Sequence, residues 1–247
     1  EDLEMILHPM VEDAQEAVGS MGDDTPIAVL SDKYRGLHHY FRQGFSQVTN
    51  PPIDSLRETR VMTLKTRLGN LGNVMDEDSS QVAVLQLESP VLSTAEFAAM
   101  RETMGRSACV VDCTFPVAEG ESGLRAALER IRREAEEGVR AGCTHVILTD
   151  EAMSATRAAI PMILATGGGH THLVRSSLRT FTSLNVRAAE CLDVHTFAVL
   201  IGVGATTINA YLAQEGIADR HRPGLFGGIS LKEAVQRFKK AVDKGLR

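Results

Sequence analysis

The feature that most constrains the fold is a long amphipathic helical period between two short apolar runs. Over residues 124–139 the apolar side chains recur every three or four positions, opposite a face of Arg and Glu. An apolar run at residues 110–113 precedes this stretch, and another at residues 144–150 follows Gly142, which ends the helix. A strand, a helix and a strand of these lengths form a right-handed crossover between parallel strands. The sequence therefore predicts an α/β fold.

Capping signals locate two further helices. Ser93 and Glu96 form a capping box that opens a helix over residues 94–104, and Ser230 and Glu233 form a second box before an amphipathic C-terminal helix. Pattern and turn residues also predict several less regular elements. These are strands at 81–87 and 182–186, helices at 161–178, 193–201 and 206–217, a short strand or helix start at 27–30, and a solvated loop over 54–80.

Composition excludes several classes of protein. The net charge of −6 provides no positive field for nucleic acid, so nucleic acid is not an expected partner. Apolar stretches such as residues 197–203 are too short to cross a membrane, and the first residues lack a secretory leader, so a cytoplasmic location is expected. The four cysteines lack the paired spacing of metal sites and are expected to be reduced, mostly buried structural thiols: Cys109, Cys113, Cys143 and Cys191.

Glycines and histidines suggest two possible binding sites. The run Gly167, Gly168 and Gly169 is compatible with a phosphate cradle, but it lacks a following Lys-Ser/Thr, and close helix packing is the more ordinary explanation. Two imidazoles and a carboxylate suit zinc or iron, so a second set of residues is a candidate metal site: His170, His172, His195 and Asp193. The adjacent His38 and His39 are expected to face apart.

Candidate catalytic residues are few. No GxSxG elbow is present, so the carboxylates at the predicted strand ends, Asp112 and Asp150, are the candidates for an independent α/β enzyme, with helix capping as the more common role. A segment of interleaved cations and aromatic rings is interpreted as a protein-docking surface: Lys33, Tyr34, Arg35, Tyr40, Phe41 and Arg42.

Long strings of the sequence resemble one family. The runs DKYRGLHHYFRQ at residues 32–43 and FSQVTNPPID at residues 45–54 closely resemble the large subunit of glutamate synthase. Shorter matching stretches follow the same order along the chain: 20–26, 87–92, 145–150, 178–180 and 202–206. The resemblance therefore covers nearly the whole chain and is to the central domain of that subunit.

The resemblance implies a domain plan and a role. Residues 1–24 would be a linker from a preceding amidotransferase domain, and this linker would lie outside the core. Residues 25–230 would be a central α/β domain of parallel βα units, similar to a truncated barrel with an N-terminal extended or helical arm. Residues 231–247 would lead toward an FMN-binding domain. The FMN and iron–sulfur clusters of the parent enzyme would lie outside this chain, which is expected to be inactive alone.

The implied function is to join the two active-site domains of a glutamate synthase and to help line its ammonia tunnel. By similarity the candidate tunnel-lining residues are Gln47, Thr49, Asn50, Pro51 and Ile53, in a proline-fixed loop. The expected partners are the amidotransferase and FMN-binding domains of the same polypeptide, with the small subunit as a further possibility. An independent enzyme at Asp112 or Asp150, or a pure interaction module, are the alternatives.

Overall fold

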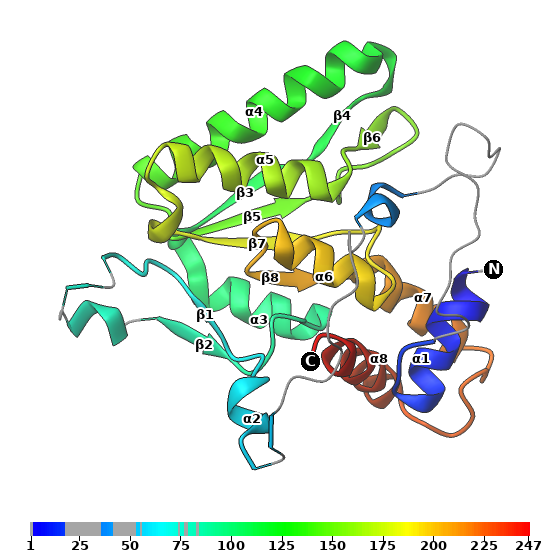
Figure 1. Cartoon of the computed structure of the whole chain (residues 1–247). Coiled ribbons are helices and arrows are strands. Elements are labelled where there is room, and N and C mark those ends of the chain that lie inside the picture. Colours follow the sequence, from blue (N-terminus) through cyan, green and yellow to red (C-terminus); the bar gives the residue numbers. More distant parts are fainter. Residues whose placement is uncertain are drawn as a thin grey trace.

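The computed structural model describes residues 2–17, 36–41, 53–54, 56–73, 75–76, 79–82 and 84–247. Its centre is a parallel sheet of four strands in the order β3 (Ala108–Asp112), β5 (His145–Thr149), β7 (Ser183–Arg187) and β8 (Thr207–Asn209). Each strand lies beside the one before it in the chain, as in part of a βα barrel (Figure 1). The predicted α/β class with parallel βα units is confirmed.

Three helices connect these strands on one face of the sheet. They are α4 (Gly120–Arg140), α5 (Met162–Arg175) and α6 (Val194–Gly202). In α4 the buried side chains include Ala127, Ile131, Ala135 and Val139, one per helical turn, so the face that the sequence predicts does pack inward. These helices and the sheet residues that point toward them form the main hydrophobic core.

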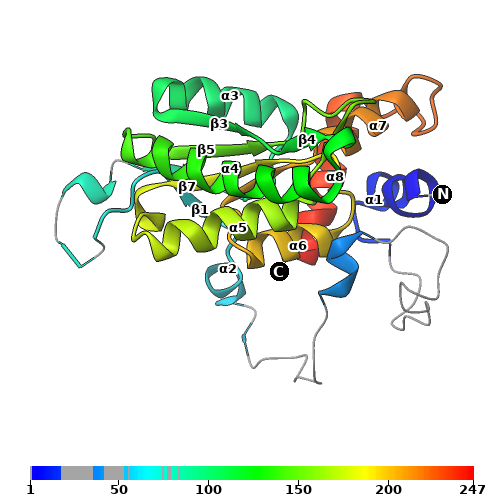
Figure 2. The ribbon, with the colours of Figure 1, turned by 90° about the horizontal axis from the view of Figure 1, so that it is seen from above.

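A different helix covers the other face of the sheet. Helix α3 (Thr94–Met104) begins at Ser93, and both hydrogen bonds of the predicted capping box are present. Its Phe97, Met100 and Met104 pack with Ile147 of β5 in a second hydrophobic cluster. Figure 2 shows α3 on one side of the strands and α4, α5 and α6 on the other. The sheet is therefore sandwiched between helices.

Two small antiparallel sheets are separate from the central one. Strand β1 (Thr66–Leu68) pairs with β2 (Leu85–Leu87), and β4 (Thr114–Pro116) pairs with β6 (Arg157–Ala159). The prediction of a loop throughout residues 54–80 is wrong at β1 and at the short helix α2 (Glu58–Val61). The strand predicted at residues 81–87 is limited to its last three residues.

The helix predicted over residues 206–217 is two elements. Residues Thr207–Asn209 form the edge strand β8, and the helix α7 begins only at Tyr211 and ends at His221. Backbone pairing with β7 places Ile208 beside Val186, and Ile208 also bonds to residues 90 and 92 on its other side. These backbone pairings make Thr207–Asn209 a strand, and no local sequence pattern indicates them.

The N-terminal segment contributes to the core. Helix α1 (His8–Asp13) packs against the last helix, α8 (Leu231–Gly245), and the π-helical turn before it (Leu3–Leu7) packs against α7. Leu7, Met10 and Val11 are completely buried. A helical N-terminal arm is therefore present, but the expectation that residues 1–24 lie outside the core is wrong for these three. At the start of α8, Ser230 accepts a hydrogen bond from the Glu233 amide, and the Glu233 carboxylate pairs with Arg237 instead of completing a capping box.

The three adjacent glycines lie inside α5. A Cβ at Gly167 would be 3.6 Å from Val203, one at Gly168 would be 3.5 Å from Arg132, and one at Gly169 would meet no atom within 4 Å. Close packing therefore does not require any of them. The three glycines lie in the middle of α5, whereas a phosphate cradle would use the free backbone amides at a helix N-terminus.

Replacing each of these glycines with alanine should therefore raise the free energy of unfolding. Alanine has the higher helix propensity, so we expect a gain of about 0.5–1 kcal/mol at each position. Urea unfolding of Gly167→Ala, Gly168→Ala and Gly169→Ala would measure the gains. Gly120→Ala is the control, since its φ of +53° makes alanine unfavourable there. A loss of stability at all three α5 positions would contradict the argument.

Candidate functional site

The two carboxylates predicted at the strand ends are held by internal partners. Oδ1 of Asp112 accepts hydrogen bonds from the amide and hydroxyl of Thr114 at 2.9 and 2.8 Å, and its Oδ2 pairs with Arg157 at 2.7 Å. Asp150 is 2% exposed and accepts hydrogen bonds from the Ala189 amide at 3.2 and 2.9 Å. Asp112 thus fixes the turn into β4, and Asp150 joins the loops that follow β5 and β7.

Burial gives Asp150 an unusual titration. Burial raises the pKa of this carboxyl above its ordinary value despite the opposing effect of the Ala189 hydrogen bonds. Because the folded pKa is the higher one, the stability contributed by this group is fully present below the unfolded pKa. It is lost as the pH rises through the folded pKa.

Replacing Asp150 with asparagine should remove that loss. We expect the free energy of unfolding of Asp150→Asn, relative to the unchanged chain, to improve as the pH rises from about 3 to 7. Urea unfolding at a series of pH values would measure the trend. Asp219→Asn, an exposed residue on α7, is the control. A difference between Asp150→Asn and the unchanged chain that is the same at every pH would contradict the assignment.

Arg187 occupies the centre of this carboxyl-terminal edge of the sheet. It pairs with Glu151 at 2.9 Å and donates a hydrogen bond to Asn209, and its guanidinium lies 4.8 Å from the ring centroid of Tyr211 and 5.5 Å from that of Phe97. Burial would raise the pKa of Glu151, but the hydrogen bond and charge of Arg187, together with the Thr149 hydroxyl and the charge of Arg101, hold the pKa below its usual value. Sequence reasoning missed this cluster, although Arg187 directly follows a predicted strand.

A polar network runs along the α3 face of the sheet. The Nδ1 of His145 is hydrogen-bonded to Ser183 Oγ at 2.9 Å, Asn185 donates to the same oxygen at 3.0 Å, and Thr207 donates to Asn185 at 2.8 Å. Burial lowers the pKa of His145, which favours its neutral form. Every member is buried and hydrogen-bonded, so the network fixes the positions of neighbouring strands.

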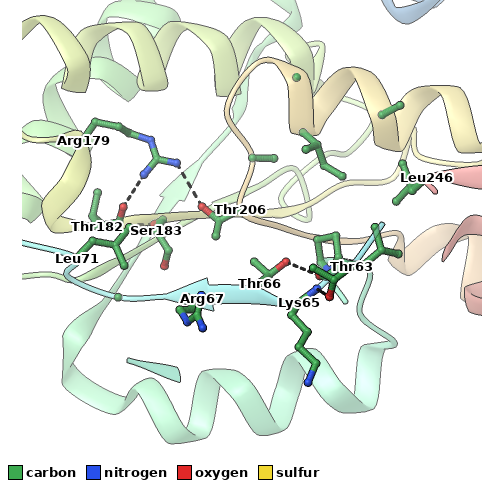
Figure 3. A pocket seen from close by; sticks show the side chains of 17 residues that line it. Thr63, Lys65, Thr66, Arg67, Leu71, Arg179, Thr182, Ser183, Thr206 and Leu246 are labelled. Atoms are coloured by element: carbon green, nitrogen blue, oxygen red, sulfur yellow. Dashed lines mark hydrogen bonds between the residues drawn. The ribbon is translucent and has the colours of Figure 1, made fainter. Parts of the chain in front are cut away.

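The amino-terminal edge of the sheet contains a pocket of about 640 Å³ (Figure 3). Thr66 lies on the side of β1 that faces Thr206, whereas Lys65 and Arg67 extend from the other side. The lining combines threonine hydroxyls and apolar residues, such as Ile201 of α6 and Leu246, with the cationic residues Lys65, Arg67 and Arg179. Among the described residues, no carboxylate belongs to this lining, so it disfavours a cation.

Arg179 closes one side of this pocket. It donates hydrogen bonds to the carbonyls of Thr182 and Gly204 at 2.6 and 3.0 Å, and to Nδ1 of His170 at 3.0 Å. Burial lowers the pKa of Arg179, and burial together with the arginine charge lowers that of His170. The guanidinium joins the start of β7 to the loop before β8. The Arg179 guanidinium is therefore occupied by contacts within the chain.

The histidines predicted as one metal site lie in two places. On α5, His170 accepts from Arg179, and His172 is hydrogen-bonded to Glu136 of α4 at 2.5 Å. Asp193 and His195 instead lie at the start of α6, close to His38 and His39. The rings of His38 and His39 have centroids 4.1 Å apart, so the expectation that they face apart is wrong. Both residues lie in the 3₁₀ turn Leu37–Tyr40.

The cysteine thiols are suited to structural roles. Cys113 and Cys191 are buried, and all four cysteines are free. Burial raises the pKa of Cys113 and Cys191, and burial together with the neighbouring Cys143 thiol raises the pKa of Cys109 to about 12. These shifts make the three thiols poor nucleophiles near neutral pH.

The structure describes only part of the other predicted sites. Of the candidate tunnel-lining residues, Ile53 is described and half-buried, while Gln47, Thr49, Asn50 and Pro51 lie outside the described residues. Of the docking segment, Tyr40 and Phe41 are described and are 53% and 41% exposed. The remaining members, Lys33, Tyr34, Arg35 and Arg42, are outside, as is the run at residues 27–30. Within the described residues, no helix is both long and apolar enough to cross a membrane.

Comparison with known proteins gives a consistent result. A family model described as the glutamate synthase central domain matches residues 1–247. The glutamate synthase [NADPH] large chain of Azospirillum brasilense is 72% identical over 246 residues, and the ferredoxin-dependent glutamate synthase of Spinacia oleracea chloroplasts is 38% identical over 258. Each match covers 100% of this chain and 16% of the relative. The chain therefore belongs to the glutamate synthase central-domain family.

Proposed function

We propose that this chain is the non-catalytic central domain of a glutamate synthase large chain, joining a glutaminase domain to an FMN-dependent synthase domain. The parent enzyme would be cytoplasmic and would make L-glutamate from L-glutamine and 2-oxoglutarate, using FMN and iron–sulfur clusters held elsewhere in the polypeptide. The high identity to the NADPH-named large chain favours NADPH as its electron donor. Residues 1–24 and 231–247 would connect to the flanking domains, and a small subunit would be a further partner.

The observation that carries the scaffold role is the state of the carboxyl-terminal sheet edge. An independent α/β enzyme places its reactive groups there. In this chain Asp112 and Asp150 are used to fix loops, and Arg187 is enclosed by Glu151, Asn209 and two aromatic rings. These side chains are held by contacts within the domain. This favours a supporting domain over the alternative of an independent enzyme.

An assay of the purified chain tests this role. A folded chain that carries no flavin or iron and does not hydrolyse glutamine would agree with the scaffold role. Retained flavin, bound iron–sulfur cluster or glutaminase activity would overturn it. Cooperative thermal unfolding, followed by circular dichroism, would establish that the preparation is folded.

We further propose that the segment containing Gln47, Thr49, Asn50, Pro51 and Ile53 lines an ammonia tunnel in the parent enzyme. Support comes from the resemblance of this segment to the family and from the pocket whose lining begins at Thr63, shortly after Ile53, and contains no carboxylate from the part of the chain that the structure describes. Ammonia crosses a protein as an uncharged molecule, so hydroxyl and apolar groups form a suitable path. Carboxylates along the path would instead bind its protonated form, ammonium.

The tunnel proposal is tested by blocking the path in the full-length enzyme. Thr49→Trp should reduce glutamate formation from glutamine and leave formation from added ammonia nearly unchanged. Thr103→Trp adds the same bulk at an exposed position of α3 and should affect neither reaction. Equal losses with glutamine and with ammonia in Thr49→Trp would count against the tunnel.

The exposed aromatic pair offers one surface for contact with a flanking domain. Tyr40 and Phe41 are neighbours at the end of the 3₁₀ turn and remain accessible to solvent. We propose that this pair is part of the docking surface within the parent enzyme. The double substitution Tyr40→Ser and Phe41→Ser should then weaken domain assembly, measured by limited proteolysis, without changing intrinsic glutaminase chemistry. Unchanged proteolysis would remove this surface from the proposal.

A further inference from the structure

Three potential metal ligands from distant parts of the chain meet where α6 begins. One ligand atom from each of His38, His39 and Asp193 lies within 4.8 Å of the others. Among the residues that the structure describes, this is the one group of three His, Cys, Asp or Glu side chains close enough to share an ion. All three residues are half-buried. These three residues form the His38–His39–Asp193 cluster.

Hydrogen bonds hold the two halves of this cluster together. Oδ1 of Asp193 accepts from the amide and hydroxyl of Thr196 at 2.8 and 2.6 Å, which caps α6 and fixes the carboxylate. Nε2 of His195 is hydrogen-bonded to the carbonyl of His38 at 2.9 Å, which attaches the 3₁₀ turn to α6. The carboxylate and the backbone beside the imidazoles are therefore positioned by the fold.

Gly36 shows that the His38 ring has a defined place. A Cβ on Gly36 would lie 2.4 Å from Cε1 and 2.6 Å from Nδ1 of His38, closer than side chains approach. The imidazole therefore packs directly over a position that has no side chain. Any larger residue at position 36 would displace the ring from the cluster.

The chemistry of this donor set selects a class of ligand. Two neutral imidazoles and one carboxylate form a nitrogen and oxygen site suited to zinc and other divalent first-row transition metals, whereas magnesium and calcium prefer oxygen alone. Glu16 lies near enough for its charge to act on Asp193 and His195 and adds negative charge beside the cluster. A divalent cation would offset the repulsion between these two carboxylates.

We propose that the His38–His39–Asp193 cluster binds one divalent transition-metal ion, with zinc as the test ion. The ion would join the 3₁₀ turn to the N-terminus of α6 and would leave a coordination position for water or for Glu16. This role is structural. It is separate from the proposed scaffold function, because either proposal can fail without the other.

Zinc chloride titrated into the metal-free chain tests the proposal. We expect saturable binding of one ion per chain by isothermal titration calorimetry, together with an increase in Tm on adding zinc. Asp193→Asn and His39→Ala should each weaken binding at least tenfold, roughly the size of effect seen when metal sites lose supporting groups. Asparagine caps helices as well as aspartate does, so Asp193→Asn separates loss of the ligand from loss of the fold.

Two controls identify the site. His172→Gln removes a half-buried histidine from α5, away from the cluster, and should leave the zinc affinity unchanged. X-ray absorption should show only nitrogen and oxygen neighbours near 2.0–2.1 Å, whereas thiolates such as Cys109 and Cys143 would place sulfur near 2.3 Å, roughly the usual zinc–sulfur distance. Absence of saturable binding, unchanged affinity in Asp193→Asn, or sulfur ligation would each overturn the proposal.

Discussion

Replacing Arg179 with leucine should reduce the free energy of unfolding by about 3 kcal/mol or more. The guanidinium donates to Thr182 and Gly204 carbonyls and to His170, and the substitution would leave these acceptors in a partly buried region without their donor. The cost of unpaired buried polar groups accounts for most of the expected loss. Urea unfolding followed by circular dichroism would measure it.

Two further variants, one at the nearby Arg175 and one at Arg179 itself, make this prediction more specific. Arg175→Leu makes the same chemical change at an exposed position at the end of α5 and should alter stability by no more than about 0.5 kcal/mol. Arg179→Lys retains a positive charge but presents a single ammonium where the guanidinium reaches three elements, so it should recover only part of the loss. If Arg179→Leu and Arg175→Leu were equally stable, the proposed role of Arg179 would be wrong.

Substituting Gly204 with alanine should cost about 3 kcal/mol. Gly204 has a φ of +118°, which an L-residue rarely adopts, and a Cβ there would lie 2.4 Å from the His170 ring. Backbone strain and steric overlap therefore act together. Thermal and urea unfolding would both register the change.

The glycine two positions earlier is a matched control. Gly202 ends α6, and a Cβ there would meet no atom within 4 Å, so Gly202→Ala should be neutral or stabilising by up to about 1 kcal/mol. Adding His170→Ala to Gly204→Ala should remove the overlap but retain the backbone strain, so it should restore only part of the stability. Similar behaviour of Gly202→Ala and Gly204→Ala would contradict this account.

The sequence was most informative where a pattern is long or a signal is local. The helical period of α4 extends over several turns, and the box formed by Ser93 and Glu96 involves residues three positions apart, so both were readable without the fold. The parallel class followed from α4 and its flanking strands. In contrast, β1 and β8 contain three residues each, too few to show a period of two.

The remaining misses depend on distant partners. The burial of Met10 and Val11 requires α8, which lies far along the chain, and the meeting of His38 with Asp193 requires the 3₁₀ turn to lie beside α6. Arg187 was overlooked because its partners come from α3, α7 and the loop after β5. The family resemblance supplied the scaffold role but contained no information about these contacts.

The pairing of α1 with α8 has a consequence for synthesis on the ribosome. The apolar side of α1 is translated 218 residues before the helix that covers it, since α1 ends at Asp13 and α8 begins at Leu231. At usual elongation rates the wait is roughly ten to fifty seconds. During that interval Met10 and Val11 remain available to chaperones or to unrelated nascent chains, so the closing step of folding is set by translation of α8.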